Sequence, residues 1–278
     1  MEKHIIALDL DGTLLNDQKT ISEKNLKTIE AAKEAGHIVV IATGRPHRVS
    51  KQYYSQMDLT TPMVNMNGAY VHHPKDKSWG VKHSPMPKDT AYDIFDIANH
   101  FGSKNVMAEI IDQVYIEKND ESLMTNFFTT GLEEAAIFGD LKENLKTDPS
   151  SILIYPDEEA APKIQEALNE NHASLIDHRK WMDPFSVVEV IRSGLHKAIG
   201  LQMISKYYGI PQERIIAFGD EDNDLEMIEY AGVGVAMGNG IDELKTLAKE
   251  ITLTNEEDGI SHFLEDYLRL NKKQFSKN

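Results

Sequence analysis

The sequence predicts an α/β protein with a parallel-sheet core and an inserted α+β domain. Short apolar runs alternate with amphipathic helical stretches before Tyr70 and again after Val190. A strand, a helix and a second strand in succession form a right-handed parallel unit, so both regions fit one Rossmann-like sheet. The region between them also contains strands and helices, but its strands lack the polar residues that end the core strands. In a chain of 278 residues, we therefore expect residues 1–83 and 190–278 to form the core and residues 84–189 to form the inserted domain.

The elements of the first core region follow from their apolar runs and end signals. An apolar strand starts at His4 and ends at two aspartates, and Ser22 can cap the helix that follows. Gly36 ends this helix, and the continuous apolar run Ile38–Ala42 is typical of a strand that is buried on both faces. Met63–Met66 repeats the pattern as a short strand.

The remaining elements are predicted in the same way. A hairpin turn is expected at residues 72–77, and a frayed polar tail is expected at residues 271–278. In the inserted domain, we expect helices over 91–99 and 158–171 and strands over 113–117, 152–155 and 187–191. In the second core region, the expected helices are 197–208, 225–231, 242–249 and 260–270, and the expected strands are 214–218 and 233–237.

The composition of the chain argues against several classes of function. The formal net charge of −16 argues against a nucleic-acid-binding surface, which needs clustered Lys and Arg. No apolar run reaches the roughly 18 residues of a membrane span, and the start of the chain lacks an apolar signal-peptide core. The absence of cysteine rules out disulfides, thiolate zinc sites and cysteine nucleophiles. We therefore expect a cytoplasmic enzyme for a small molecule, without nucleic-acid or membrane partners, as a monomer or weak homo-oligomer.

Asp9 and Asp11 form the most informative pair of residues, because they follow the first strand directly. Open parallel sheets bind ligands at this carboxyl edge. Two carboxylates about 4 Å apart repel each other by roughly 4 kcal/mol at the effective dielectric of a partly buried site, and a cation would relieve this repulsion. Their hard oxygen atoms suit Mg²⁺, which can bridge carboxylates to a substrate phosphate. An acidic turn after an edge strand is the alternative, whereas the position of Gly12 does not fit an EF-hand.

Two further predicted strands end in polar residues, Thr43 and Asp220. In a parallel sheet these strand ends meet Asp9 at one edge, although the residues lie far apart in the sequence. Asp220 is then a natural third oxygen ligand for a metal that Asp9 and the Asp11 carbonyl bind. Thr43 and the Gly44 amide supply donors of the kind that bind phosphate oxygens, and the alternative is a simple strand-to-helix cap.

Lys197 stands in the first turn of a predicted helix, where the helix dipole disfavours a cation by about 0.3–1 kcal/mol. This position indicates that the lysine binds an anion, and the alternative is a solvated surface lysine. The acidic loop after Asp220 also has an ordinary interpretation as a helix start. There Asp222 would cap the helix and Asp224 would favour its dipole.

Together these residues resemble the haloacid dehalogenase superfamily of phosphatases, and within it the Cof-type group with a large α+β cap. Several motifs that follow one another in the family's order make a specific signature, and the resemblance covers the whole chain. One position departs from the family, because Ala198 stands where glycine is usual and Gly200 comes later. The matching motifs are Asp9-Leu10-Asp11-Gly12-Thr13, Thr43-Gly44-Arg45, Asn67-Gly68, Lys197, Gly219 to Asp224 with Met227, Met237-Gly238-Asn239, and Asn255 to Gly259.

The resemblance implies a phosphatase that works through an aspartyl-phosphate intermediate with Mg²⁺ as cofactor. Asp9 would be the nucleophile, and Asp11 would be the general acid and base. Asp224 would orient Lys197 or a metal-bound water, and the inserted domain would act as a lid that selects the substrate. The implied binding residues are Thr43, Gly44, Lys197 and Asn223 for the phosphate and Asp9, Asp11 and Asp220 for the metal, with Asp224 and Arg45 in support.

The resemblance leaves the substrate open. Sugar phosphates, phosphorylated vitamins or their precursors, and flavin or pyridoxal phosphates all fit. A phosphomutase, in which Asp9 passes the phosphoryl group to another substrate hydroxyl, is the nearest alternative. A phosphoryl-accepting sensor or binding protein is a weaker alternative, because receiver domains lack an acid two residues after the phosphorylated aspartate.

Overall fold

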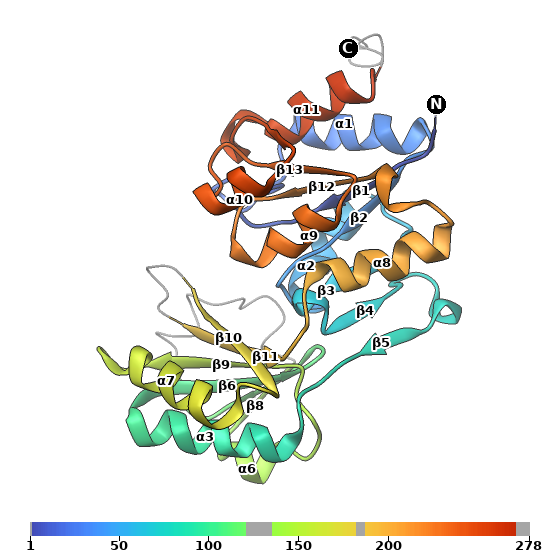
Figure 1. Ribbon diagram of the computed structural model, residues 1–278. Helices are drawn as coiled ribbons and strands as arrows, with labels where there is room; N and C mark the ends of the chain where they lie inside the picture. Colours follow the sequence, from blue (N-terminus) through green and yellow to red (C-terminus); the bar gives the residue numbers. More distant parts are fainter. Residues whose placement is uncertain (1, 121–134, 182–186, 271–278) are drawn as a thin grey trace. The chain divides into compact units, whose positions relative to one another are not determined.

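The computed structural model describes residues 2–120, 135–181 and 187–270, and the chain divides into two compact units (Figure 1). The first unit contains Met1–Gly44, Lys51–Val81 and His196–Asn278, and the second contains Arg45–Ser50 and Lys82–Leu195. The tail that was expected at residues 271–278 lies outside the described residues. Within the described ranges, no helix combines the length and the apolar character that crossing a membrane requires.

The first unit is built on a sheet of five strands: β1 (Ile5–Leu8), β2 (Ile38–Ile41), β12 (Ile215–Gly219), β13 (Val233–Ala236) and β14 (Glu250–Ile251). Their order across the sheet is β14-β13-β12-β1-β2, and all neighbours pair in parallel. The central strand β1 pairs with β12 on one side and β2 on the other, so that Ile5 lies opposite both Ile215 and Ile38. This topology confirms the predicted α/β core.

Both faces of this sheet are covered by helices: α1 (Glu23–Glu34), α2 (His47–Gln56), α8 (Lys197–Tyr208), α9 (Leu225–Tyr230), α10 (Asp242–Leu247) and α11 (Gly259–Tyr267) (Figure 1). Ile6 and Phe218 face one apolar cluster, which includes residues of α1 and α11. Ile5 and Ala217 face the other cluster, which includes residues of α8, α9 and α10. Because burial of one large apolar side chain contributes about 1.5–3 kcal/mol, these two layers fix the sheet and the edge where its strands end.

The predicted end signals of α1 are confirmed. The Ser22 side chain accepts a hydrogen bond from the Asn25 amide at 3.0 Å, as an N-cap residue does. Gly36 follows the helix with φ 91°, a backbone conformation that L side chains rarely adopt. The first helix therefore begins and ends where its sequence predicts.

The strand predicted at Met63–Met66 forms, but it does not extend the parallel sheet. The observed strand β3 (Met63–Asn65) belongs to a separate three-stranded sheet with β4 (Tyr70–His72) and β5 (Val81–His83). A single parallel bridge between Ala42 and Val64 links it to the end of β2. The chain turns back directly after three strand residues, so β3 pairs antiparallel with β4 instead. The hairpin expected at 72–77 is the longer connection from β4 to β5, and it includes a 3₁₀ turn at Lys77–Trp79.

The second unit contains a six-stranded sheet in the order β10-β11-β9-β6-β7-β8. Its strands are β6 (Ser103–Ile110), β7 (Gln113–Ile116), β8 (Ala136–Phe138), β9 (Ser151–Pro156), β10 (Ile176–Lys180) and β11 (Val188–Arg192), and its helices are α3 (Lys88–Phe101), α6 (Leu141–Asn144) and α7 (Ala160–His172). Apolar residues of α3 and α7 pack on one face of the sheet. The sequence prediction missed β6, β8 and β10, and polar residues at the start of β6 and over most of β10 obscure the strand pattern there.

The observed units differ from the predicted domain boundaries at three places. A boundary at residue 190 would cut β11, and the second unit in fact continues to Leu195. It also begins at Lys82 and includes Arg45–Ser50. In this last segment, the Arg48 guanidinium forms an ion pair with Glu109 at 2.6 Å, and each side chain is only 4% exposed. A buried pair of this kind is not apparent from sequence spacing.

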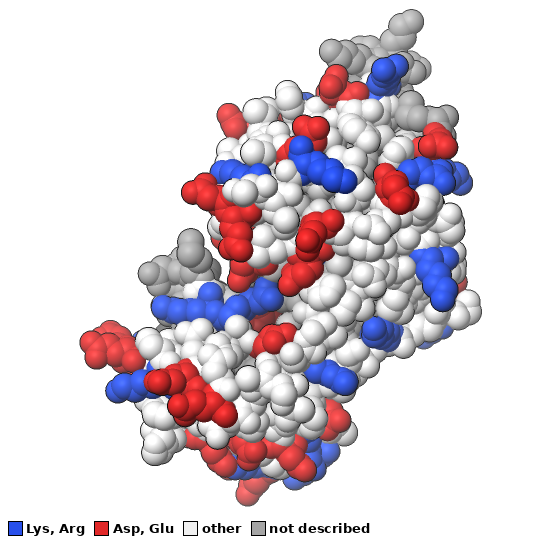
Figure 2. Space-filling view, viewed as in Figure 1, with Lys and Arg blue, Asp and Glu red and all other residues white. Residues whose placement is uncertain are grey.

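Figure 2 shows acidic side chains interspersed with basic ones on the face that it draws.

Candidate active site

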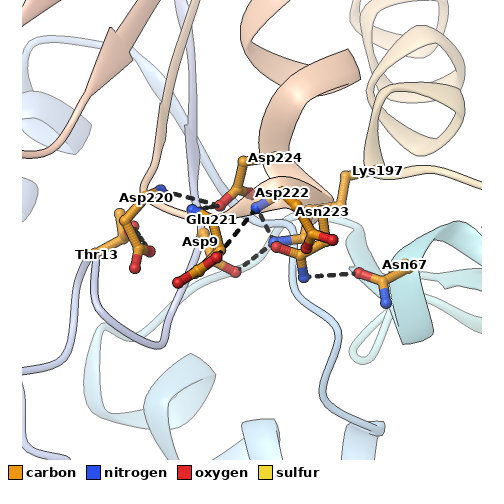
Figure 3. Close-up of polar contacts among 9 residues, drawn as sticks. All are labelled: Asp9, Thr13, Asn67, Lys197, Asp220, Glu221, Asp222, Asn223 and Asp224. Carbon is orange, nitrogen blue, oxygen red and sulfur yellow. Dashed lines mark hydrogen bonds and ion pairs between the residues drawn. The ribbon is translucent and has the colours of Figure 1, made fainter. Parts of the chain in front are cut away.

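Three acidic side chains meet at the carboxyl edge of the parallel sheet in the first unit (Figure 3). Asp9 follows β1 and Asp220 follows β12, and the Asp9 amide donates to the carbonyl of Phe218 at 3.2 Å, which extends the pairing of these strands. Asp224 lies four residues beyond Asp220. One carboxylate oxygen from each aspartate lies within 4.8 Å of the others, and all three residues are buried. The expected convergence of Asp9 and Asp220 is therefore observed.

Lys197 is the cation of this cluster. Its Nζ donates to Oδ1 of Asp9 at 2.6 Å and to Oδ1 of Asp224 at 2.7 Å, and its side chain is 0% exposed. Burial alone would lower the pKa of Lys197, but the charges of Asp224 and Asp9 and their hydrogen bonds raise it above the usual value. The lysine is thus a buried cation that contacts two carboxylates, and the surface-lysine alternative is wrong.

The cluster has more negative charge than Lys197 neutralises. Burial raises the pKa of Asp9 to about 7, although the charge of Lys197 acts in the opposite direction. Burial also raises the pKa of Asp220 to about 8, and the charges of Asp9 and Asp224 add to this effect. Both carboxylates would be ionised more easily beside an additional cation.

This donor set fits a divalent metal ion. Asp9, Asp220 and Asp224 supply hard oxygen donors that lie within 4.8 Å of one another, and Mg²⁺ prefers donors of this kind. Asp224 already binds Lys197 through Oδ1, and its Oδ2 accepts from the Asp220 amide at 3.0 Å. The carboxylates of Asp9 and Asp220 are therefore better suited to bind a metal than that of Asp224.

Asp220 is oriented by the Gly12-Thr13 turn that follows the first strand. The Thr13 hydroxyl donates to Oδ1 of Asp220 at 2.7 Å. Gly12 has φ 72°, and a Cβ at this position would lie 2.1 Å from Oδ2 of Asp220. Only glycine therefore leaves room for the Asp220 carboxylate. The sequence prediction treated these residues as part of a motif but did not predict this contact.

The acidic loop after Asp220 differs from its expected capping pattern. Glu221, not Asp222, is the N-cap of a 3₁₀ turn over Asp222–Asp224, and Asp224 completes its capping box. Oδ2 of Asp224 also accepts from the Glu221 amide at 3.3 Å, while Asp222 is exposed. Asp224 therefore connects Lys197 to the backbone of this loop, because its side chain binds both.

Asp11 lies two residues after Asp9, and its charge is among the effects that raise the pKa of Asp9. Its carboxylate forms an ion pair with Lys19 at 2.9 Å, and this side chain is 39% exposed. It is not part of the group of three carboxylates. A solvent-accessible carboxyl group two residues after Asp9 is able to exchange protons with a ligand or with water.

The residues expected to bind phosphate lie on neighbouring loops. Thr43 is buried at the end of β2, and its amide donates to the carbonyl of Val64 at 2.9 Å. The side-chain nitrogen of Asn223 donates to Oδ1 of Asn67 at 3.1 Å. A Cβ on Gly44 would lie 3.3 Å from the Asn67 amide group and 3.5 Å from that of Asn223. Gly44, Asn67 and Asn223 therefore lie together, although Asn67 was not among the predicted site residues.

Arg45 and Ala198 are two further positions that the sequence singled out. Arg45 is buried and belongs to the second unit. Ala198 is buried within α8, which starts regularly at Lys197, so the missing glycine does not disturb the helix start. At Gly200, a Cβ would lie 2.3 Å from Cγ2 of Val64, so the small residue allows α8 to pack closely against β3.

Comparisons with known proteins identify the family. The profile of the haloacid dehalogenase-like hydrolases matches residues 6–264. YitU of Bacillus subtilis (strain 168), a 5-amino-6-(5-phospho-D-ribitylamino)uracil phosphatase, is 55% identical over 269 residues, which cover 96% of this chain and 98% of the relative. The pyridoxal phosphate phosphatase YbhA of Escherichia coli (strain K12) is 29% identical over 275 residues and is covered completely. It aligns with 96% of this chain.

Solved structures agree with this assignment. The crystal structure of a haloacid dehalogenase-like hydrolase from Bacteroides thetaiotaomicron has a TM-score of 0.83 and 26% sequence identity, and the match covers 96% of this chain and 100% of the other. An α/β hydrolytic enzyme with an additional sheet domain is thus the class that the fold defines. The chain belongs to the haloacid dehalogenase-like hydrolase family, and within that family it is a phosphatase of the Cof-type group.

Proposed function

We propose that this phosphatase hydrolyses 5-amino-6-(5-phospho-D-ribitylamino)uracil through an aspartyl phosphate on Asp9, with Mg²⁺ as cofactor. The reaction mechanism is supported above all by the buried contact of Lys197 with both Asp9 and Asp224. The proposed substrate is supported by the 55% identity to the Bacillus subtilis relative.

In the first step, an oxygen of the Asp9 carboxylate attacks phosphorus, and the bond from phosphorus to the ester oxygen breaks. Lys197 binds Oδ1 of Asp9 and thereby fixes the rotation of the carboxylate before the reaction. Asp11, two residues further on, gives its proton to the leaving oxygen of the ribityl group. The products of this step are the free alcohol and the aspartyl phosphate.

In the second step, water attacks phosphorus and the bond between phosphorus and Asp9 breaks. Asp11 takes a proton from this water, which restores the acid for the next cycle. Inorganic phosphate then leaves. Dividing the hydrolysis in this way requires one nucleophile and one acid-base residue, and Asp9 and Asp11 are positioned on one short segment.

The phosphoryl oxygens would be bound by four groups. These are the Thr43 hydroxyl, the Gly44 amide, the Lys197 ammonium and the Asn223 carboxamide. Such donors stabilise the charge that develops on the transferring group, and they act strongly because their surroundings are largely buried. Asp224 would keep Lys197 in place. Arg45 stays a predicted supporting residue without an assigned role in this mechanism.

Asp9, Asp220 and the carbonyl of Asp11 would bind Mg²⁺. When bound, the cation offsets the repulsion between the Asp9 carboxylate and the phosphate. The Gly12-Thr13 turn would serve this site indirectly, since it orients the Asp220 carboxylate. A role of the inserted domain in selecting the substrate stays a prediction from the family resemblance.

The proposal is tested with a panel of phosphate esters and purified protein, with and without Mg²⁺. We expect the highest kcat/KM for the ribitylaminouracil phosphate and lower values for pyridoxal phosphate and sugar phosphates. The release of inorganic phosphate should require Mg²⁺ and should be lost in Asp9→Asn. Preferential hydrolysis of pyridoxal phosphate would contradict the proposed substrate. Recovery of the phosphoryl group on another substrate hydroxyl would indicate a phosphomutase instead.

A further inference from the structure

Three successive residues after β3 adopt left-handed backbone conformations. Met66, Asn67 and Gly68 have φ values of 50°, 51° and 93°. Such a conformation is ordinary for glycine but unfavourable for a long side chain such as that of Met66, and it persists only where the surrounding structure imposes it. All three residues are buried. This Met66–Gly68 turn therefore keeps an unfavourable backbone close to the candidate active site.

The Met66–Gly68 turn contacts the backbone next to two residues of the proposed phosphate site. The amide of Asn67 donates to the carbonyl of Thr43 at 3.2 Å. A Cβ on Gly68 would lie 2.5 Å from the carbonyl oxygen of His196, the residue before Lys197. The turn thus lies against both the end of β2 and the start of α8.

The side chain of Asn67 reaches a third residue of the phosphate site. Its Oδ1 accepts from Nδ2 of Asn223 at 3.1 Å (Figure 3). A carboxamide nitrogen carries two hydrogens, and its orientation decides whether a donor or an acceptor faces a ligand. With one hydrogen bound to Asn67, the nitrogen of the Asn223 carboxamide is fixed on the side of Asn67. Its second hydrogen can then bind a phosphoryl oxygen.

We propose that Asn67 is a positioning residue of the phosphate site, which orients the Asn223 carboxamide as a donor while its own backbone fixes Thr43. This inference rests on the proposed function, because it assumes that Asn223 and Thr43 bind phosphate. The unfavourable backbone is then explained as a requirement of the site.

The test uses Asn67→Gly, Asn223→Ala and the double variant. Glycine accepts the left-handed backbone, so Asn67→Gly should keep or raise the thermal midpoint while it removes the carboxamide. We expect kcat/KM to fall by roughly ten- to a hundredfold in each single variant. The double variant should be no worse than Asn223→Ala within about twofold, because both changes remove the same interaction.

Two controls separate positioning from general stability. Arg269→Gly changes another left-handed residue, which is exposed at the end of α11, and it should leave kcat/KM unchanged. Asn67→Asp keeps an acceptor for Asn223 but adds a negative charge, so it should weaken the binding of inorganic phosphate more than Asn67→Gly does. This order reports the charge at residue 67 beside the phosphate, whereas the double variant reports whether Asn67 acts through Asn223.

The affinity for inorganic phosphate in the presence of Mg²⁺ is measured by calorimetry for the same set of variants. If the unaltered protein binds phosphate but hydrolyses no ester, the proposed function fails, while non-additive losses of phosphate affinity still support the role of Asn67. Full activity and full affinity in Asn67→Gly would overturn the inference. Losses that multiply in the double variant would also overturn it, since they would show that Asn67 and Asn223 act independently.

Discussion

Lys197 and Asp9 are 188 positions apart in the sequence, yet the Nζ of the lysine lies 2.6 Å from Oδ1 of the aspartate. Both side chains are buried, and Lys197 also contacts Asp224. The start of α8 is therefore connected to the ends of β1 and β12 through one ammonium group. This contact makes both the stability and the proposed chemistry of the site depend on a single cation.

Removal of this cation should destabilise the protein strongly. Lys197→Met leaves the Asp9 and Asp224 carboxylates buried without their partner. Removing one partner of a buried ion pair lowers the free energy of unfolding by about 3–5 kcal/mol. Urea unfolding at pH 7 measures the change. Lys206→Met, at an exposed lysine on the same helix, is the matched control and should cost little. Equal stability of the two variants would contradict the role of Lys197 in the cluster.

Stabilisation by Mg²⁺ should increase with pH. In the folded metal-free protein, the pKa values of Asp9 and Asp220 are raised to about 7 and about 8, above their values in the unfolded chain. Between the unfolded and folded pKa values, the folded state binds more protons, so its stability falls as pH rises through this window. A metal replaces these protons, and its binding is favoured where the carboxylates are already ionised.

Thermal midpoints with and without Mg²⁺ at pH 5.5 and pH 8.5 measure this effect. The increase caused by Mg²⁺ should be larger at pH 8.5. Asp17→Asn, at an exposed aspartate, should preserve the difference between the two pH values. An increase that is equal at both pH values, or larger at pH 5.5, would show that protons and Mg²⁺ do not compete for these carboxylates.

A methyl group at residue 12 should weaken the metal site selectively. In Gly12→Ala, the new Cβ would meet Oδ2 of Asp220 at 2.1 Å, so the carboxylate has to move. The concentration of Mg²⁺ that gives half-maximal activity should rise at least roughly tenfold, because a metal ligand is displaced. Gly209→Ala is the matched control. This glycine also has positive φ, but an added Cβ would meet no neighbouring group within 4 Å.

Gly209→Ala should lower the free energy of unfolding by about 1–2 kcal/mol, because alanine is unfavourable in a left-handed backbone conformation. Its half-maximal Mg²⁺ concentration should stay that of the unaltered protein. If both alanine variants require the same Mg²⁺ concentration as the unaltered protein, the contact between Gly12 and Asp220 has no role in metal binding.

Close packing between α8 and β3 should make residue 200 sensitive to size. Gly200→Ala places a Cβ 2.3 Å from Cγ2 of Val64, and overpacking of this kind costs about 1–3 kcal/mol. Adding Val64→Ala should recover part of this loss, because it removes the clashing methyl groups. Denaturant unfolding of the single and double variants tests this, and additive destabilisation would contradict direct contact.

Local sequence patterns predicted the parts of the fold whose signals are local. The apolar run of β1, the cap at Ser22 and the glycine at residue 36 each act within a few residues, and all are found as predicted. The meeting of Asp9 with Asp220 was also predictable, since a parallel sheet brings its strand ends to one edge.

Other features depend on contacts between distant segments. The strand β6 was missed because polar residues at its start obscure its pattern, and the pairing of its buried Glu109 with Arg48 is not shown by any local pattern. Asn67 belongs to one of the sequence motifs, but its contact with Asn223 depends on the left-handed turn that contains it. An asparagine followed by glycine is a signal for such a turn, and it could have drawn attention to this residue.

The most direct test of the account is to stop turnover with acid and to look for a phosphoryl group on the peptide that contains Asp9. The protein is mixed with Mg²⁺ and the ribitylaminouracil phosphate, quenched during turnover, digested and analysed by mass spectrometry. We predict a phosphorylated Asp9 peptide in the unaltered protein and neither label nor phosphate release in Asp9→Asn. Continued phosphate release by Asp9→Asn, without a labelled peptide in either protein, would contradict Asp9 as the nucleophile.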